Sequence, residues 1–132
     1  MDTINERLKG RSILIVDDDP RNTFALLSYL DGMEMNIHTA EDGFQAIALL
    51  DNHINIELIL MDMMMPEMDG YETIGRIRNN QATAGIPIIA VTAKAMKGDR
   101  DKCLEAGASE YVSKPVNMQE LLQKIEDMLN PV

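Results

Sequence analysis

The sequence predicts an α/β protein with a doubly wound, five-stranded parallel sheet. Segments with strand-like and helix-like patterns alternate five times along the 132 residues, and this alternation is typical of a parallel sheet with helices on both faces. Three strand-like segments are apolar throughout, as central strands are, whereas the second alternates and the fifth is very short. The strand order 2-1-3-4-5 places those last two segments at the edges of the sheet.

The five expected strands differ in pattern as their places in the sheet require. The first, third and fourth are the continuous apolar runs Ser12–Val16, Leu58–Met61 and Ile86–Val91. The second, Glu34–Thr39, alternates polar and apolar residues, which indicates a strand with one face exposed. The fifth is the short segment Tyr111–Ser113.

Caps and breakers mark the helices between these strands. Four of the expected helices each begin after a short polar residue that can cap the helix. These cap residues are Asp19, Asp42, Asp69 and Asn117. The residues expected to face the core are Phe24, Leu27 and Leu30; Phe44, Ile47 and Ala48; Tyr71, Ile74 and Ile77; and Leu121, Leu122, Ile125, Met128 and Leu129. A weaker helix covers Lys97–Ala106 and ends at Gly107.

Composition and charge exclude several classes of function. The formal net charge of −10 argues against a nucleic-acid surface, which needs clustered Lys and Arg. Cys103 is the only cysteine, so the chain has no internal disulfide and no thiolate metal cluster. No apolar run approaches the ~18 residues of a membrane span, so we expect a cytoplasmic domain without membrane contact.

The first residues differ in character from the rest. Met1–Arg11 is charged and lacks an apolar face. We therefore interpret residues 1–11 as a lead-in or linker segment and residues 12–130 as one compact domain.

Three carboxylates are expected to meet at one edge of the sheet. Asp17 and Asp18 follow the first strand, and Asp62 follows the third, its neighbour in the predicted order. The carboxyl ends of these strands flank the topological switch point, where open α/β folds bind ligands. Three acids this close would repel one another, and Mg²⁺ suits an all-oxygen site of this kind.

The same edge carries two further polar residues. Thr92 ends the fourth strand, and Lys114 follows the fifth. Three carboxylates, Mg²⁺ and one lysine sum to zero charge, so the site could receive a phosphoryl group. A carboxylate can itself act as the nucleophile and form an aspartyl phosphate.

Four stretches of the chain resemble, in the same order, the receiver domain of two-component response regulators. They are ILIVDDDP at Ile13–Pro20, LMDMMMPEMDG at Leu60–Gly70, VTAKA at Val91–Ala95 and YVSKP at Tyr111–Pro115. The resemblance extends from about Ser12 to Leu129 and implies the flavodoxin-like receiver fold. It also implies a signalling module that is phosphorylated by a phosphohistidine and is not a turnover enzyme by itself.

The resemblance implies roles in phosphoryl transfer for the acidic residues. Asp62 is similar to the phosphoacceptor of the family. Asp17 and Asp18 are similar to the acidic pair that binds Mg²⁺, which Mn²⁺ can replace, with Asp62 and the backbone carbonyl of Met64 as the other protein ligands. An apolar Met64 side chain, at a position that in similar receivers influences access of hydrolytic water together with Lys94, predicts slow self-dephosphorylation.

The resemblance also implies a conformational switch. Lys114 is similar to the lysine that pairs with the acceptor, and Thr92 to the hydroxyl residue that moves onto the phosphoryl group. Tyr111 is similar to the coupled aromatic switch, a role that only the resemblance favours, because a tyrosine at such a position is more often an edge-strand packing residue. The Lys114–Pro115 peptide bond is expected to be cis, as in similar domains.

The partner expected from the resemblance is a histidine kinase or a histidine phosphotransfer protein. The sequence VDDDPRNTFAL and the stretch from Ala90 to Ala108 are most similar to the receivers of hybrid sensor histidine kinases. We therefore expect this domain to be the receiver of such a kinase. A stand-alone response regulator is the alternative origin. The sequence does not predict the cognate kinase or the oligomeric state.

Two alternatives from other classes stay open at this point. A haloacid-dehalogenase-like phosphatase also uses a strand-end aspartate with Mg²⁺, but its motif has a second aspartate where this chain has Met64. A flavodoxin-like nucleotide or flavin binder would need a glycine-rich phosphate loop, which the sequence lacks. The methionines around Asp62 are interpreted as packing residues, because no cysteine or histidine accompanies them.

Overall fold

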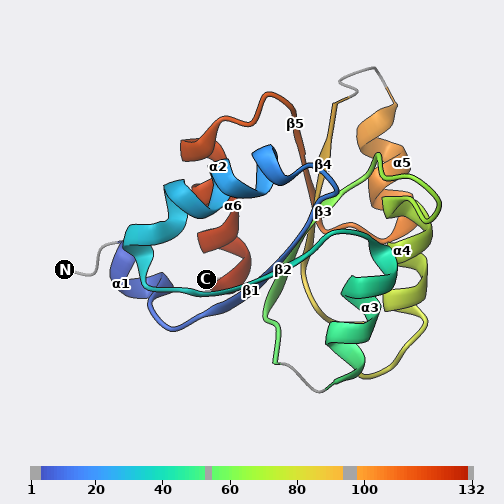
Figure 1. The fold of residues 1–132 in the computed structure, drawn as a ribbon, viewed down its shortest axis with the longest axis horizontal. Coiled ribbons are helices and arrows are strands. Elements are labelled where there is room, and N and C mark those ends of the chain that lie inside the picture. The colour runs from blue at the N-terminus through green and yellow to red at the C-terminus, as the bar shows by residue number, and fades with distance from the viewer. Residues whose placement is uncertain (1–3, 53–54, 94–97, 131–132) are drawn as a thin grey trace.

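A computed structural model of the chain describes residues 4–52, 55–93 and 98–130, and it has the predicted architecture (Figure 1). Five parallel strands form one sheet in the order β2-β1-β3-β4-β5. The strands are β1 (Ser12–Val16), β2 (Asn36–Ala40), β3 (Leu58–Asp62), β4 (Ile88–Thr92) and β5 (Glu110–Ser113). The predicted fold class and strand order are confirmed.

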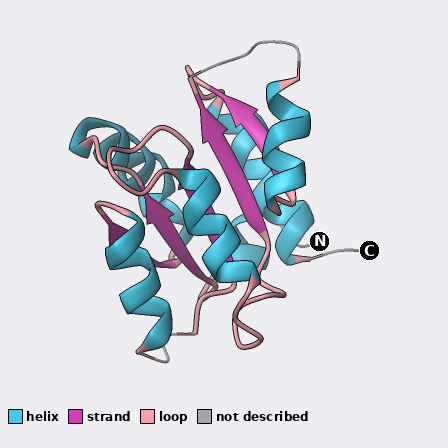
Figure 2. Cartoon of the chain, turned by 90° about the vertical axis from the view of Figure 1, so that its right-hand side faces the viewer, coloured by secondary structure: helices cyan, strands magenta, loops and turns pink. Residues whose placement is uncertain are grey.

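Helices cover both faces of this sheet (Figure 2). The helices are α1 (Ile4–Leu8), α2 (Pro20–Leu30), α3 (Gly43–Asp51), α4 (Gly70–Arg78), α5 (Asp99–Ala106) and α6 (Met118–Leu129), with a 3-10 turn η1 at Asp31–Met33. Within the described residues, no helix has the length and apolar character needed to cross a membrane.

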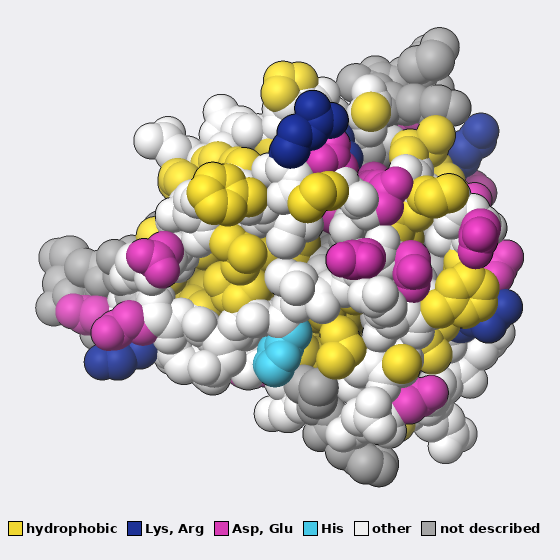
Figure 3. Space-filling model, viewed as in Figure 1, with side chains coloured by type: hydrophobic (Ala, Val, Ile, Leu, Met, Phe, Trp, Pro, Cys, Tyr) yellow, Lys and Arg dark blue, Asp and Glu magenta, His cyan; other side chains and the backbone are white. Residues whose placement is uncertain are grey.

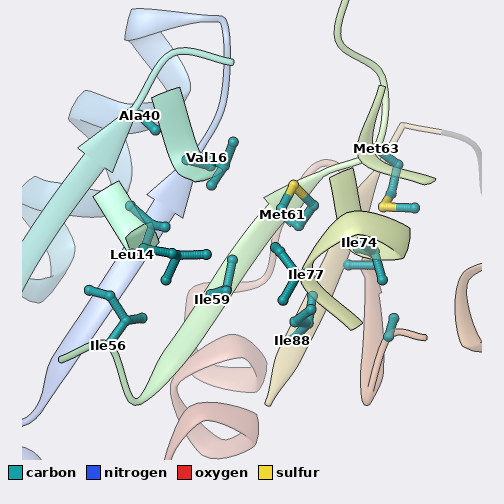
Figure 4. Close-up of a cluster of buried hydrophobic side chains, with 14 of the residues drawn as sticks. Leu14, Val16, Ala40, Ile56, Ile59, Met61, Met63, Ile74, Ile77 and Ile88 are labelled. Carbon is teal, nitrogen blue, oxygen red and sulfur yellow. The ribbon is translucent and has the colours of Figure 1, made fainter. Parts of the chain in front are cut away.

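Alternate residues of the central strands separate the core into two clusters. Leu14, Ile59 and Met61 point toward α3, α4 and α5, where they meet Ile74 and Ile77 (Figure 4). The intervening residues of the same strands point toward α1, α2 and α6. Because both faces of β3 and β4 are covered, all residues of these strands are buried, as their apolar sequences predict.

The four predicted caps all form. The side chains of Asp19, Asp42, Asp69 and Asn117 accept hydrogen bonds of 2.8–3.0 Å from backbone N–H groups in the first turns of α2, α3, α4 and α6. These bonds satisfy donors that a helix leaves unpaired at its start. The helix ends next to the carboxyl edge of the sheet are therefore fixed by local sequence.

The predicted inward faces of α2 and α3 are wrong at their aromatic residues and at Ala48 of α3, which is exposed. Phe24 is 71% exposed and Phe44 is 52% exposed. The buried residues of α2 are Leu26 and Leu30, and those of α3 are Gly43, Ala46 and Leu50. The start of α3 packs closely on α4, because a Cβ at Gly43 would collide with Thr73 Oγ1.

The segment before β1 is attached to the domain. Leu8 is completely buried in the core cluster beneath α2 and α6, so the expected lack of an apolar face is wrong. The Arg7 guanidinium lies 2.6 Å from Glu126 of α6, and that of Arg11 lies 2.6 Å from Glu57 and donates to Asn130. A domain boundary at residue 12 stays a prediction.

Candidate functional site

Asp17, Asp18 and Asp62 converge at the carboxyl edge of the sheet. Asp62 ends β3, Asp17 directly follows β1, and the two strands pair side by side. Carboxylate oxygens of the three residues lie within 4.8 Å of one another. Asp17 and Asp62 are buried, whereas Asp18 is exposed. The switch point between the first and third strands thus holds the predicted acidic cluster.

Lys114 supplies the positive charge next to this cluster. Its Nζ lies 3.5 Å from Asp62 Oδ1 and 3.7 Å from Asp17 Oδ2. The residue directly follows β5, and its backbone N–H donates to the Thr92 carbonyl at 2.7 Å. The Lys114–Pro115 peptide bond is cis. The edge of the sheet therefore brings together a buried carboxylate pair and one ammonium group.

Backbone N–H groups orient the two buried carboxylates. The Met64 N–H donates to Asp62 Oδ1 at 3.1 Å, and the Asp19 N–H donates to Asp17 Oδ1 at 2.8 Å. Sequence reasoning did not identify the Asp19 N–H, although an acid two residues before a helix cap is the pattern that allows such a turn. The other oxygen of Asp17, Oδ2, faces the Lys114 ammonium, whereas in Asp62 it is Oδ1 that faces both Lys114 and the Met64 N–H.

Burial dominates the electrostatics of Asp62. It raises the pKa of this carboxyl to about 6, and the nearby negative charge of Asp17 acts in the same direction. The Met64 N–H and the Lys114 ammonium oppose this rise in pKa. The net effect is a carboxylate that is destabilised when the site holds no cation, which is the condition that a divalent ion relieves.

Thr92 and Tyr111 lie on the two strands next to β3. Thr92 is buried at the end of β4, one residue beyond Val91, which pairs with Asp62. Tyr111 pairs with Ala90, and its half-buried ring packs against the core cluster beneath α4 and α5. Burial raises the pKa of its hydroxyl. Lys94, which was predicted to influence hydrolytic water, lies outside the described residues.

The loop after Asp62 packs through its methionines. Met63, Met65 and Met68 are buried, while the Met64 side chain is 49% exposed. The loop returns to α4 at Gly70, where a Cβ would lie only 2.7 Å from the Asp62 carbonyl oxygen. A glycine is therefore required for this close approach.

A groove on the α2 side of the acidic cluster was not predicted. It has a volume of about 520 Å³ and is lined by Asp17, Asp18, Phe24, Leu27 and Glu41, among others. Figure 3 shows apolar and acidic side chains next to each other on the face that α2 and β2 present. The sequence could not identify this groove, because a phenylalanine at helical spacing is more often a core residue.

Comparisons with known proteins all identify a response regulator receiver domain. A family model for the response regulator receiver domain matches residues 13–126. The transcriptional regulatory protein CpxR of Escherichia coli K12 is 40% identical over 117 residues, which are 89% of this chain and 48% of CpxR. The sensor histidine kinase RcsC of the same organism is 40% identical over 114 residues, which are 86% of this chain and 12% of RcsC. The chain thus spans about half the length of CpxR and a smaller part of RcsC.

A solved structure has the same fold. The receiver domain of the sensor histidine kinase PA1611 from Pseudomonas aeruginosa PAO1 is 36% identical, with a TM-score of 0.78 over 89% of this chain and 95% of that domain. That structure has a magnesium ion coordinated in its active-site cleft. With a family match over most of its length, this chain belongs to the response regulator receiver domains of two-component systems.

Proposed function

We propose that this receiver domain accepts a phosphoryl group from a phosphohistidine onto Asp62 in a Mg²⁺-dependent reaction. The observation that carries the proposal is the position of the Lys114 ammonium, 3.5 Å from the buried Asp62 carboxylate and 3.7 Å from that of Asp17. A nucleophilic carboxylate needs such a cation beside it when a charged group approaches. Membership of the receiver family leaves the phosphatase alternative without support.

The donor set of the site fits Mg²⁺. Asp17, Asp18, Asp62 and the backbone carbonyl of Met64 would hold the ion through oxygen atoms, which are the ligands that Mg²⁺ prefers. Mn²⁺ can occupy the same kind of site. The bound ion would neutralise charge on the phosphoryl oxygens during transfer.

The chain's own residues would carry the transfer itself. An Asp62 carboxylate oxygen attacks phosphorus as the bond from phosphorus to the histidine nitrogen breaks, and the electron pair of that bond returns to the imidazole. The Lys114 ammonium stabilises charge on the phosphoryl oxygens. The product is an aspartyl phosphate, and its phosphoryl group adds about −1.5 to −2 of charge at this edge of the sheet.

The new charge would then bias the conformation of β4 and β5. Thr92 lies on β4 one residue beyond Val91, which pairs with Asp62, and its hydroxyl would shift onto a phosphoryl oxygen. Tyr111 lies on the adjoining strand and would follow inward. Phosphorylation in this proposal shifts a pre-existing equilibrium between two arrangements, because a ligand moves such an equilibrium only by its differential affinity.

The test of this function is phosphate uptake from a small donor. With acetyl phosphate and Mg²⁺, we expect intact-mass measurements to show one phosphoryl group per chain, and none when EDTA replaces Mg²⁺. Hydrolysis of a small phosphate ester over many cycles per chain, without a phosphorylated protein, would contradict the proposal. Uptake that continues at the same rate in EDTA would contradict the metal requirement.

The groove beside Phe24 suggests where a protein donor makes contact. Phe24 is 71% exposed and borders the acidic cluster, so a histidine kinase or histidine phosphotransfer protein that reaches Asp62 would cover this ring. Exposed aromatic residues of this kind often dominate protein–protein binding.

Phe24→Ala should therefore separate protein donors from small ones. We expect phosphorylation by a phosphorylated histidine phosphotransfer domain that acts on the parent chain to become about tenfold slower, the effect of losing one aromatic contact. Uptake from acetyl phosphate should not change. Phe44→Ala is the matched control, because Phe44 is also exposed but does not line the groove. Equal slowing with both donors would contradict a docking role.

The origin of the chain is a related proposal. We propose that it is the receiver of a cytoplasmic signalling protein of the sensor-kinase class. The similarity to the receivers of RcsC and PA1611 supports this proposal, although the identity to CpxR is equal to that with RcsC. The reading frame upstream of Met1 would decide between a hybrid kinase and a stand-alone regulator.

A further inference from the structure

The chain contains three Asp-Gly pairs, and the structure places them in different surroundings. They are Asp31–Gly32, Asp42–Gly43 and Asp69–Gly70. An aspartate that precedes a glycine can isomerise without an enzyme, because the glycine carries no side chain that would keep its nitrogen away from the aspartate carboxyl group. The surroundings of each pair therefore decide where this change of the backbone occurs first.

Two of these pairs are held at helix starts. The carboxylates of Asp42 and Asp69 accept hydrogen bonds of 2.8 and 2.9 Å from backbone N–H groups in the first turns of α3 and α4. The glycines that follow them are buried, and the Gly70 N–H donates to the Met63 carbonyl at 3.3 Å. A reaction between side chain and backbone at either pair would break a helix cap and displace closely packed backbone.

The pair Asp31–Gly32 is open to solvent. Both residues are exposed and lie in η1, the single turn between α2 and β2, which contains no buried residue. Among the residues that the structure describes, no hydrogen bond or ion pair holds the Asp31 side chain. A short 3-10 turn without buried contacts opens easily, so the Gly32 nitrogen can reach the Asp31 carboxyl group.

We propose that Asp31 is the site at which the folded chain forms isoaspartate. The Gly32 backbone nitrogen attacks Cγ of the Asp31 carboxyl group, and the amide proton leaves together with the carboxyl hydroxyl as water. Hydrolysis of the resulting succinimide ring at the backbone carbonyl carbon leaves the chain connected through the side chain of residue 31. One water is lost and one is regained, so the product has the same mass as the parent chain.

The lengthened backbone would loosen the attachment of the lead-in segment. Isoaspartate adds one methylene to the main chain between α2 and β2, and because β2 is fixed by its pairing with β1, the turn takes up the extra length. Figure 1 shows this turn beside α1. The Glu34 carbonyl at its end accepts from the Gly10 N–H at 2.9 Å, and the Glu34 carboxylate lies 3.3 Å from Lys9 Nζ. A shift of Glu34 would break both contacts.

The first experiment locates the isomerisation. The folded chain is incubated for days at neutral pH, and peptide fragmentation that distinguishes isoaspartate from aspartate follows the three Asp-Gly pairs. We expect isoaspartate to form about fivefold faster at Asp31 than at Asp42 or Asp69, because reaction at those two residues must first break a helix cap. This difference should disappear in urea, where all three pairs are unfolded. Equal rates at Asp31 and Asp69 in the folded chain would overturn the proposal.

Gly32→Ala is the matched variant. A Cβ at Gly32 would meet no atom within 4 Å, and the residue does not have a left-handed backbone, so the fold should be kept. A methyl group beside the attacking nitrogen hinders ring closure. We therefore expect the rate at residue 31 to fall to that of Asp42 or below it. Isoaspartate at the parent rate in this variant would show that Gly32 does not take part.

Limited proteolysis measures the consequence for the lead-in segment. Trypsin cleavage after the exposed Lys9 is compared in fresh parent chain, aged parent chain and aged Gly32→Ala. We expect cleavage of the isoaspartate-containing chains to be about fivefold faster, the factor that corresponds to the loss of one hydrogen bond. An unchanged rate in those chains, or the same increase in aged Gly32→Ala, would overturn this effect. All of these measurements use unphosphorylated chain, so their outcome does not depend on the proposed function.

Discussion

Asp62→Asn should abolish phosphate uptake. The amide is a poor nucleophile and cannot carry the negative charge that the metal site and Lys114 are arranged to hold. Acetyl phosphate with Mg²⁺ should therefore leave the intact mass of the variant unchanged under conditions that phosphorylate the parent chain. Uptake by Asp62→Asn at the parent rate would contradict the assignment.

Asp19→Asn is the matched control for this loss. Asp19 is the next acid after Asp18, but its carboxylate caps α2 and pairs with Arg21. Asparagine caps a helix about as well as aspartate, so the fold should be kept. The variant also retains the backbone N–H that donates to Asp17. We expect it to be phosphorylated as the parent is, and a complete loss here would indicate that charge near the site, rather than the acceptor, decides uptake.

The same Asp62→Asn substitution should stabilise the metal-free fold at neutral pH. In the folded chain the pKa of this carboxyl is about 6, above the value of about 3.9 in an unfolded chain. Stability is therefore lost as pH rises from about 4 to about 6, since the folded state must ionise a group that it disfavours.

Removing that group should raise the free energy of unfolding at pH 7 by about 3 kcal/mol, because each unit of pKa difference corresponds to about 1.4 kcal/mol. Urea unfolding of both chains in EDTA at pH 4 and at pH 7 measures this difference. The gain should be present at pH 7 and nearly absent at pH 4. A gain that is larger at pH 4 than at pH 7 has the wrong sign for this account.

Arg78→Ala should have the largest effect on stability. The guanidinium at the end of α4 donates to the carbonyls of Ala84, Ile86 and Gly107 at 2.6–2.9 Å. It therefore joins the loops that lead into β4 and β5. Alanine would leave these carbonyls without hydrogen-bond donors. Each unsatisfied acceptor of this kind lowers the free energy of unfolding by about 1–3 kcal/mol when it is buried.

Because Arg78 is only partly buried, water can replace some of these bonds, and we expect a total loss of about 2–4 kcal/mol in the free energy of unfolding. Arg76→Ala on the same helix is the control. Arg76 pairs with Glu72 at 3.1 Å on the exposed surface, and such a pair contributes less than about 0.5 kcal/mol. Similar losses in the two variants would show that the Arg78 bonds contribute little.

The arrangement of the site could be predicted because it depends on strand order. Apolar runs identified the central strands, and the order of the sheet then brought Asp62 beside Asp17 and Lys114 to the same edge. Local signals were equally reliable for the helix caps, since a cap such as Asp69 acts within four residues. Both kinds of inference use patterns that are contained in short stretches of sequence.

Contacts between distant segments could not be predicted in this way. The exposure of Phe24 and Phe44 depends on how closely α2 and α3 approach the sheet, and helical spacing alone does not determine that distance. Leu8 is buried because α6 passes over it, and a single leucine in a charged segment gives no sign of such a contact. Arg78 gave no signal either, because its partners are backbone carbonyls of other loops.

The most direct test of the central claim is the location of the phosphoryl group. The chain is phosphorylated with acetyl phosphate and Mg²⁺ and then treated with hydroxylamine, which converts an acyl phosphate to a hydroxamate at the modified carboxylate. Peptide mass spectrometry should find the hydroxamate at Asp62 and should find none after incubation in EDTA. A phosphoryl group that resists hydroxylamine, or a hydroxamate at Asp17 or Asp18 instead of Asp62, would contradict this account of the site.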